Sequence, residues 1–308
     1  MMSGFSRSSA AGLLAGATLL TLTACGSGAA ETATPSGAGR PEVVAAFYPL
    51  QWLTEQVGGP DAQVSVLTAP GVEPHDLELG IQQVTDIRNA ALTVYVKGVQ
   101  PAVDDAVSEE TSFDAATAVT TLPAGEHGHE EEEPGHEEVA YDTHIWLDPS
   151  RLATVATKLA DRLATADPAH AQGYKDRAAT TAATLGTLDQ EFTKGLASCK
   201  TKTLVTAHEA FGYLADRYKL KQVGITLDPD TEPSPTRISE VAKLAKAEGV
   251  TTIFTESLVS PKVAEVLASQ VGAKTAVLDP LESKPSGDYL SAMRDNLKTL
   301  QTALGCTA

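Results

Sequence analysis

The sequence predicts an α/β protein in which two similar parallel-sheet lobes are joined by one long helix. Three observations support this prediction. Short apolar runs alternate with amphipathic helical stretches in both halves of the chain, which is typical of parallel sheets covered by helices. A long helical pattern from 168 to about 196 separates the two halves. The length of 308 residues also exceeds what one domain usually needs.

The N-terminus is predicted to be a secretory signal. Arg7 gives it a positive start, and residues 10–22 form an apolar stretch that is too short to span a bilayer. The tetrapeptide LTAC at 22–25 resembles a bacterial lipobox, in which the chain is cut before the cysteine and the thiol is acylated. We therefore expect Cys25 to carry a lipid. The alternative is an ordinary signal peptide with an incidental cysteine.

The first half of the chain shows the β-α-β-α pattern of a parallel sheet. Its first predicted helix is stopped by the sequence Gly58-Gly59-Pro60. Strands are predicted at 43–47, 64–67, 92–96 and 119–122, and helices at 49–57, 77–89 and, more weakly, 102–108.

Two helices are predicted in the middle of the chain. Apolar residues recur at helical spacing from 152 to 163, and Asp167 followed by Pro168 resembles an N-cap with proline at the first helical position. A helix running unbroken from 168 to 196 would be about 43 Å long, enough to run along both lobes. The alternative is two ordinary helices that meet at Gly186.

The second half repeats the plan of the first. Ser234-Pro235 and Ser260-Pro261 each resemble an N-cap followed by proline in the first turn. Strands are predicted at 203–206, 222–225, 251–255 and 274–278, and helices at 209–218, 235–247, 261–271 and 288–304. The whole chain is thus divided into a signal peptide at 1–24, a flexible Gly/Ser/Ala-rich tether at 25–40, an N-terminal lobe at 41–150, connecting helices at 151–198 and a C-terminal lobe at 199–308.

The charge and cysteine content of the chain indicate which partners and which compartment to expect. The chain carries 40 acidic against 23 basic residues and a net charge of −17. Such a surface repels nucleic acid, so no nucleic-acid partner is expected, and it is consistent with a preference for cations. Cys199 and Cys306 remain once Cys25 is acylated, and an even pair in an exported protein favours a disulfide. Thiolate metal ligands are the alternative, but neither cysteine has a neighbouring partner.

Histidines and carboxylates point to a metal site. His75 and His208 each follow a predicted strand, Asp279 follows another, and His144 lies between the lobes. Ligands of open parallel sheets bind beyond the carboxyl ends of the strands, so one cleft between the lobes can collect all four side chains. Three imidazoles with one carboxylate suit tetrahedral Zn²⁺, whereas Mn²⁺ favours more oxygen donors. The alternative for each residue is an ordinary surface or hydrogen-bonding role.

Four sequence motifs make the prediction of a metal-binding protein more specific. The sequences GVEPHDLE at 71–78, THIWLDP at 143–149, TAHEAFGY at 206–213 and LDPL at 278–281 resemble successive motifs of the bacterial solute-binding protein family 9. These are metal-binding lipoproteins that supply ABC transporters. The resemblance extends from about residue 41 to the C-terminus.

The resemblance implies a function as well as a fold. It implies two α/β lobes joined by a rigid helix, with a metal held between them by His75, His144, His208 and Asp279. Because manganese carriers of the family tend to have a carboxylate where this chain has His208, it favours zinc. The implied protein is a monomer that is held by lipid at the outer face of the cell membrane and delivers Zn²⁺ to the permease of a high-affinity zinc ABC transporter.

Some features depart from the family pattern or are left open. The loop at 96–101 lacks the aromatic residue expected there. Glu232 and Glu256 are candidates for orienting a ligand imidazole, with plain surface carboxylates as the alternative. The loop at 126–142 holds eight acids and has no apolar anchor, so it should be disordered. It is either a weak zinc-gathering loop through His127, His129 and His136 or a solvated insertion with no direct role.

Rival functions are a manganese carrier, a surface adhesin of the same fold and a zinc hydrolase. The hydrolase is disfavoured because His208-Glu209 is not followed by the second histidine of His-Glu-x-x-His, and four protein ligands leave no position for an activated water. Release of bound metal to a permease would separate a carrier from an adhesin. With unperturbed histidines, metal affinity should fall as the pH drops through about 6.5.

Overall fold

The computed structural model describes residues 39–125, 139–229 and 231–307. All the elements below belong to one compact unit, Arg40–Ala308. The predicted signal peptide and the predicted tether up to residue 38, with Cys25, lie outside the described residues, as do His127, His129 and His136. None of the helices in the described part of the chain combines the length and apolar character that crossing a membrane requires.

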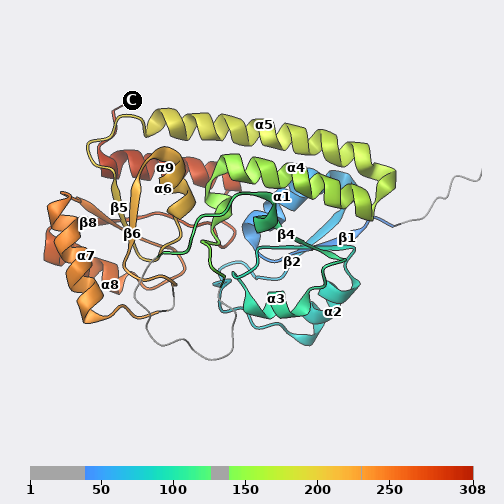
Figure 1. Cartoon of the computed structure of the whole chain (residues 1–308), viewed down its shortest axis with the longest axis horizontal. Helices are drawn as coiled ribbons and strands as arrows, with labels where there is room; N and C mark the ends of the chain where they lie inside the picture. The colour runs from blue at the N-terminus through green and yellow to red at the C-terminus, as the bar shows by residue number, and fades with distance from the viewer. Residues whose placement is uncertain (1–38, 126–138, 230, 308) are drawn as a thin grey trace, which may run out of the picture. The chain divides into compact units, whose positions relative to one another are not determined.

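Two four-stranded parallel sheets form the two lobes, and they share one strand order (Figure 1). The first has the order β2-β1-β3-β4 and the second the order β6-β5-β7-β8, so the prediction of two lobes of similar plan is confirmed. The first sheet contains β1 (Glu42–Ala45), β2 (Gln63–Val66), β3 (Leu92–Tyr95) and β4 (Ser112–Asp114). The second contains β5 (Thr203–Thr206), β6 (Lys221–Gly224), β7 (Thr252–Thr255) and β8 (Lys274–Val277).

The central strands are buried on both faces, which is why they are nearly continuous apolar runs. In the first sheet Val43 is opposite Val64 on one side and Leu92 on the other. In the second, Val205 pairs with Val223 and Ile253. Because all strands are parallel, their carboxyl ends meet at one edge of each sheet, and the loops that follow them can converge.

The helices follow the predicted pattern with shifted bounds. In the first lobe they are α1 (Tyr48–Gly58), α2 (Ile81–Asn89) and α3 (Pro101–Ala106). In the second they are α6 (Gly212–Tyr218), α7 (Pro235–Ala247), α8 (Lys262–Val271) and α9 (Tyr289–Leu304). Ser234 caps α7 by accepting from the N–H of Arg237, as predicted, whereas the N-cap position of α8 is Pro261 and not Ser260.

One predicted strand of the first lobe is wrong, and one predicted helix begins later than expected. Residues 119–122 form no strand, and the fourth strand is β4 instead. The Asp114 carboxylate accepts from the N–H of Ala116 and starts a 3₁₀ turn, Ala115–Ala118, so the chain has left the sheet before 119. The helix predicted from 77 begins only at Ile81, because Gly80 is extended and serves as its N-cap.

Two long antiparallel helices pack side by side, and the longer one, α5, extends along both lobes (Figure 1). They are α4 (Pro149–Ala166) and α5 (Ala171–Gly195), joined by a 3₁₀ turn, Pro168–His170. The 25 residues of α5 are unbroken through Gly186, so the alternative of two shorter helices is excluded. At 1.5 Å per residue α5 is about 37 Å long, and it packs on α1 in the first lobe and α9 in the second.

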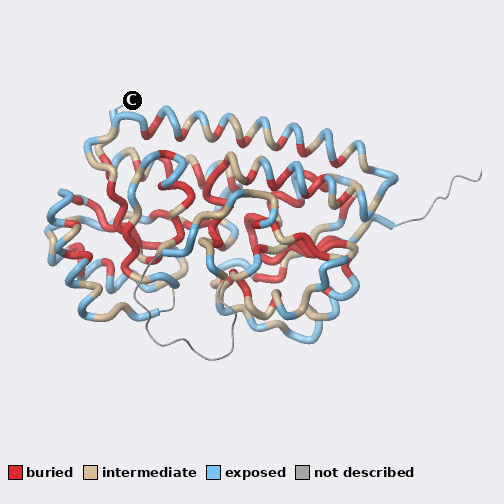
Figure 2. The backbone as a smooth tube through the Cα atoms, viewed as in Figure 1, coloured by how far each residue is buried: buried red, intermediate tan, exposed pale blue. Residues whose placement is uncertain are grey.

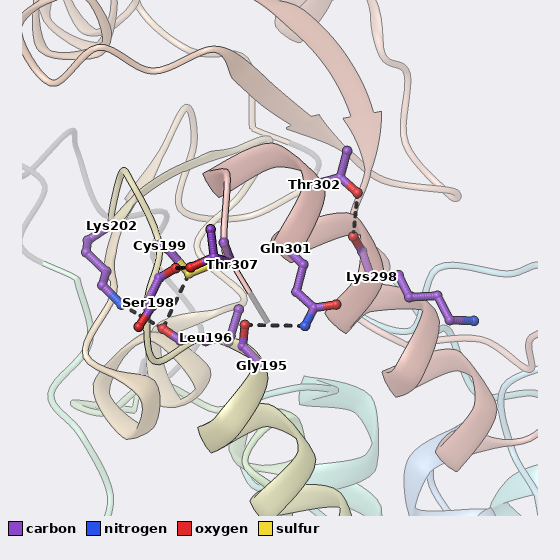
Figure 3. The surroundings of a disulfide bond; sticks show 10 residues. Gly195, Leu196, Ser198, Cys199, Lys202, Lys298, Gln301, Thr302 and Thr307 are labelled. Carbon is purple, nitrogen blue, oxygen red and sulfur yellow. Dashed lines mark hydrogen bonds between the residues drawn. A yellow bond between two sulfur atoms is a disulfide. The ribbon is translucent and has the colours of Figure 1, made fainter.

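A disulfide joins Cys199, just beyond α5, to Cys306, just beyond α9 (Figure 3). The pair is 107 residues apart in sequence, and the cysteine count predicted it. Around it, Gln301 donates to the carbonyl of Gly195 and the N–H of Thr307 donates to the carbonyl of Ser198. These contacts fix the end of the chain to the start of the second lobe.

The main hydrophobic core is continuous from the first sheet into the second lobe (Figure 2). It includes Val43 and Phe47 of the first lobe, Trp146 between the lobes, and Tyr289 and Met293 of α9. A smaller core lies between the second sheet and helices α7 and α8. The two lobes are therefore packed together through one shared hydrophobic core.

Candidate metal centre

Four ligand-type side chains converge between the lobes, two from each half of the chain. His75 lies in the loop after β2, His208 lies two residues beyond the end of β5, and Glu282 lies in the loop after β8. His144 precedes the short 3₁₀ helix η3 (Ile145–Leu147), which leads into α4. One donor atom from each residue lies within 4.8 Å of the other three. The structure thus brings together the three histidines that the sequence singled out.

Four of the six separations among these atoms are close to those of a tetrahedral zinc site. Oε1 of Glu282 lies 3.3 Å from Nε2 of His75, 3.4 Å from Nε2 of His144 and 3.6 Å from Nε2 of His208. The Nε2 atoms of His144 and His208 are 3.4 Å apart. A tetrahedron with zinc–ligand bonds of about 2.0–2.1 Å has edges of about 3.3–3.4 Å. Four donors at these separations leave room for one small cation at their centre.

His144 is held by a carboxylate of its own segment. Its Nδ1 lies 2.8 Å from Oδ1 of Asp142, and the same oxygen accepts from the backbone N–H of His144. The carbonyl of Asp142 in turn accepts from the hydroxyl of Tyr213 in α6. With Nδ1 occupied in this way, the ring presents Nε2 to the centre, which is the usual arrangement of a metal-binding histidine.

His208 is held in the same manner by a carboxylate at the end of another strand. Glu256 directly follows β7, and its Oε2 lies 2.6 Å from Nδ1 of His208 while its Oε1 accepts from the His208 N–H. The hydroxyl of Thr206 donates to the His208 carbonyl. His208 has no exposed surface. Glu256 therefore orients this ring, whereas Glu232, the other residue considered for that role, is exposed.

His75 is the most accessible of the three imidazoles. Its side chain is 15% exposed, and its ring contacts Glu282. Its backbone N–H donates to Oε1 of Glu73, two residues earlier. Burial, together with the nearby Glu282, raises the pKa of Glu73 to about 7.

Hydrogen bonds between the imidazoles and nearby carboxylates shift the pKa values of both kinds of group. Burial lowers the pKa of His144, but its hydrogen bonds to Asp142 and Glu282 outweigh burial and raise it to about 9. The same balance, with Glu256 and Glu282 as partners, raises the pKa of His208 above its usual value. Burial raises the pKa of Glu282, but contacts with the three imidazoles bring it well below its usual value. A bound cation would replace protons at this centre.

Asp279, the carboxylate predicted as the fourth ligand, is not a member of this group. Its Oδ1 accepts from the N–H of Leu281 at 2.8 Å, and its Oδ2 lies 3.5 Å from Oγ of Ser257. Glu282, three residues on, takes the position expected of it and is almost completely buried. The sequence carried one signal that could have found Glu282, which is a second carboxylate in the same loop.

A cavity of about 740 Å³ opens beside His75 and His144. The loop that lacks the expected aromatic residue forms part of its wall through Lys97 and Gly98. Tyr141 supplies an aromatic side chain there instead, and its hydroxyl donates to the carbonyl of Lys97. Acidic residues dominate the charged lining, namely Asp104, Asp105, Asp142, Glu209 and Asp228 against Lys97. The approach to the histidines is thus favourable for a cation.

Known proteins that are similar to this chain include zinc-binding and zinc-uptake proteins. Residues 43–303 match the family described as zinc-uptake complex component A, periplasmic. The zinc-binding protein AdcA of Streptococcus pyogenes serotype M3 is 37% identical over 287 residues, which cover 85% of this chain and 56% of AdcA. This chain therefore spans about half the length of the AdcA proteins that it matches. The high-affinity zinc uptake system protein ZnuA of Bacillus subtilis is 31% identical, with 94% and 95% of the two chains covered.

Solved structures show the same fold. The Zn(II)-bound ZnuA-like domain of Streptococcus pneumoniae AdcA is 32% identical with a TM-score of 0.71, and 86% of this chain and 99% of that one are covered. The laminin-binding protein Lmb of Streptococcus agalactiae, described as having adhesin and metal-transporting activity, is 33% identical with a TM-score of 0.76 and the same coverage. With a family match over most of its length, the chain belongs to the family of periplasmic component A proteins of zinc-uptake complexes.

Proposed function

We propose that this protein captures Zn²⁺ between its lobes and delivers it to the membrane permease of an ABC transporter for zinc uptake. The observation that carries the proposal is the group of three imidazole nitrogens and one carboxylate oxygen, all within 4.8 Å of one another, with four of the six separations close to those of a tetrahedral zinc site. Relatives named for zinc binding and zinc uptake support the choice of cargo.

The ligands we propose are Nε2 of His75, His144 and His208 and a carboxylate oxygen of Glu282. Glu282 replaces Asp279 in this set because its Oε1 faces all three Nε2 atoms. The second oxygen of Glu282 is buried without a hydrogen-bond partner among the described residues, as a carboxylate awaiting a cation would be. Three nitrogen donors favour zinc over manganese, which prefers oxygen.

The proposal also covers how the protein works in the cell. A lipid on Cys25 would hold a monomeric body at the outer face of the cell membrane, where an oxidising compartment suits the Cys199–Cys306 disulfide. A pneumococcal relative is named a zinc-binding lipoprotein. Because four protein donors fill a tetrahedral zinc site, no position remains for an activated water, and we propose carriage and not catalysis.

Binding is tested by calorimetry on the compact body, Arg40–Ala308, with Zn²⁺ and Mn²⁺ titrated separately into wild type, Glu282→Gln and Asp279→Asn. We expect one tight zinc equivalent, far weaker manganese binding, and loss of tight zinc binding in Glu282→Gln alone. Tight zinc binding that survives Glu282→Gln would refute the proposed ligand set.

Delivery is tested in cells of the source organism that lack the gene. Uptake of radioactive zinc at low external concentration should be restored by the wild-type gene and not by the Glu282→Gln variant. Equal uptake with and without the gene would refute a transport role even if the purified protein binds zinc.

A further inference from the structure

The turn that carries Glu282 is fixed by residues that do not face the metal centre. Asn296, a buried residue of α9 that is only 4% exposed, makes two hydrogen bonds to the backbone of Asp279. Its Oδ1 accepts from the Asp279 N–H at 3.0 Å, and its Nδ2 donates to the Asp279 carbonyl at 2.7 Å. One amide side chain therefore satisfies both backbone groups of Asp279 and ties the turn to a packed helix.

Asp279 in turn shapes the two residues that follow. Its Oδ1 accepts from the N–H of Leu281, which closes a turn around Pro280. Leu281 has a φ of 62°, a left-handed conformation that is unfavourable for leucine, and its side chain is fully buried. An unfavourable conformation persists only where surrounding contacts enforce it, and the hydrogen bond from the Leu281 N–H to Asp279 is one such contact.

A third contact links this turn to His144. The indole N–H of Trp146 donates to the carbonyl of Pro280 at 2.7 Å, and the carbonyl of Trp146 accepts from the hydroxyl of Tyr289. Trp146 is two residues beyond His144, and their rings lie 5.1 Å apart. The turn is thus set against the same segment that supplies a ligand histidine.

We propose that Asp279 and Asn296 are positioning residues for Glu282, and that they set the affinity for the metal without touching it. This inference rests on the proposed function, in which Glu282 is a zinc ligand. The side chain of Glu282 has no hydrogen bond other than those to the imidazoles among the described residues, so its place is determined by the backbone of the turn. Releasing the turn lets the carboxylate move away from the tetrahedral position.

The variants Asp279→Asn and Asp279→Ala distinguish whether Asp279 positions the turn or binds the metal. Asp279→Asn keeps an Oδ1 that accepts from the Leu281 N–H but lacks the charge of a metal-binding carboxylate. Asp279→Ala removes the acceptor altogether, and Asn296→Ala removes both bonds to the Asp279 backbone. Asp288→Ala is the matched control, because Asp288 belongs to the same connection and caps α9 through Ser291 without contacting the turn.

The measurements are the zinc dissociation constant and off-rate of the mature protein in detergent, with the absorption spectrum of bound Co²⁺ as a probe of coordination geometry. We expect Asp279→Asn to bind zinc nearly as wild type does. Asp279→Ala and Asn296→Ala should weaken binding about 10- to 100-fold, as loss of groups that orient a ligand does. They should also change the Co²⁺ spectrum, while Asp288→Ala lowers the melting temperature and leaves affinity and spectrum unchanged.

Two results would overturn the inference. A loss in Asp279→Asn as large as that in Glu282→Gln would make Asp279 a ligand. Wild-type affinity and spectrum in Asp279→Ala and Asn296→Ala would show that the turn needs neither residue. Failure of the proposed function itself looks different, because His208→Ala and Glu282→Gln would then bind zinc as tightly as wild type.

Discussion

His144 and His208 are held differently from His75. Each of the first two has a carboxylate at Nδ1, Asp142 at 2.8 Å and Glu256 at 2.6 Å. No such partner faces Nδ1 of His75 among the described residues, and His75 is the most exposed of the three imidazoles. Two of the imidazoles are thus each held at Nδ1 by a carboxylate, and the third is held only at Nε2 among the described residues.

The difference follows from the elements that carry these residues. His208 lies two residues beyond the buried strand β5, and His144 leads through η3 into α4. His75 lies in the long connection between β2 and α2, where the chain forms only turns. Fixed ligands reduce the ordering cost of binding, whereas an adjustable one gives a route for release.

Deleting a fixed imidazole should have the largest effect. His208→Ala removes a donor and leaves Glu256 and Glu282 buried without it, so we expect zinc affinity to fall by more than about 100-fold, beyond the usual cost of losing an orienting group. His75→Ala should cost less, because water can reach the accessible position of its ring. Calorimetry on both variants checks the order, and a larger loss in His75→Ala would reverse the comparison.

Removing the carboxylates that hold the rings should have the next largest effect. Asp142→Asn and Glu256→Gln each weaken the bond that orients an imidazole, and we expect zinc affinity to fall about 10- to 100-fold. Glu73→Gln is the matched control, since the hydrogen bond that Glu73 makes among the described residues is to the backbone N–H of His75 and not to an imidazole ring. An equal loss in all three variants would show that the carboxylates act through net charge and not through orientation.

The pH dependence should show opposite trends for metal-free stability and zinc affinity. With its folded pKa raised to about 9, His144 stabilises the metal-free fold fully below its unfolded pKa of about 6.5 and loses that contribution as the pH rises to 9. The loss is at most about 3 kcal/mol. Over the same range zinc affinity should rise, because fewer protons must be displaced.

Denaturant unfolding without metal and zinc titration between pH 6.5 and 9 test these two trends. The sequence alone placed the loss of affinity near pH 6.5, the value for an unperturbed imidazole. In Asp142→Asn the rise in affinity should be complete at lower pH, because His144 loses the partner that raises its pKa. An identical pH profile in wild type and Asp142→Asn would contradict this explanation.

The smallest effect on zinc binding is expected far from all three histidines. Cys199→Ser with Cys306→Ser removes the disulfide at the ends of α5 and α9. We expect the free energy of unfolding to fall by about 2–5 kcal/mol while zinc affinity is unchanged. Chemical denaturation and calorimetry on the same samples measure both quantities. A large loss of affinity would mean that the site depends on the second lobe as a whole.

Much of the fold could be predicted because its signals are local. The strand at 203–206 was predicted with the bounds it has, since a buried run of apolar and β-branched residues is bounded by polar ones. The failure at 119–122 has a local cause as well. Those residues have strand composition, but the Asp114 carboxylate starts a 3₁₀ turn first, and the true strand β4 has only three residues.

The sequence could predict only those site residues whose place follows from their position after a strand or between the lobes. His75 and His208 follow strands of parallel sheets, where ligands gather, and the structure brings them together with His144. Which of two carboxylates in one loop faces them depends on partners distant in sequence. Asn296 is 17 residues from Asp279, and Trp146 is 134 residues from Pro280. Periodicity and spacing do not contain this information.

The most direct test of the account is a crystal structure of the zinc-loaded protein, with the metal located by anomalous scattering at the zinc edge. We expect one zinc bound by Nε2 of His75, His144 and His208 and by Glu282, with Asp279 still accepting from the Leu281 N–H. Zinc coordinated by Asp279 in place of Glu282, or found away from these histidines, would contradict it.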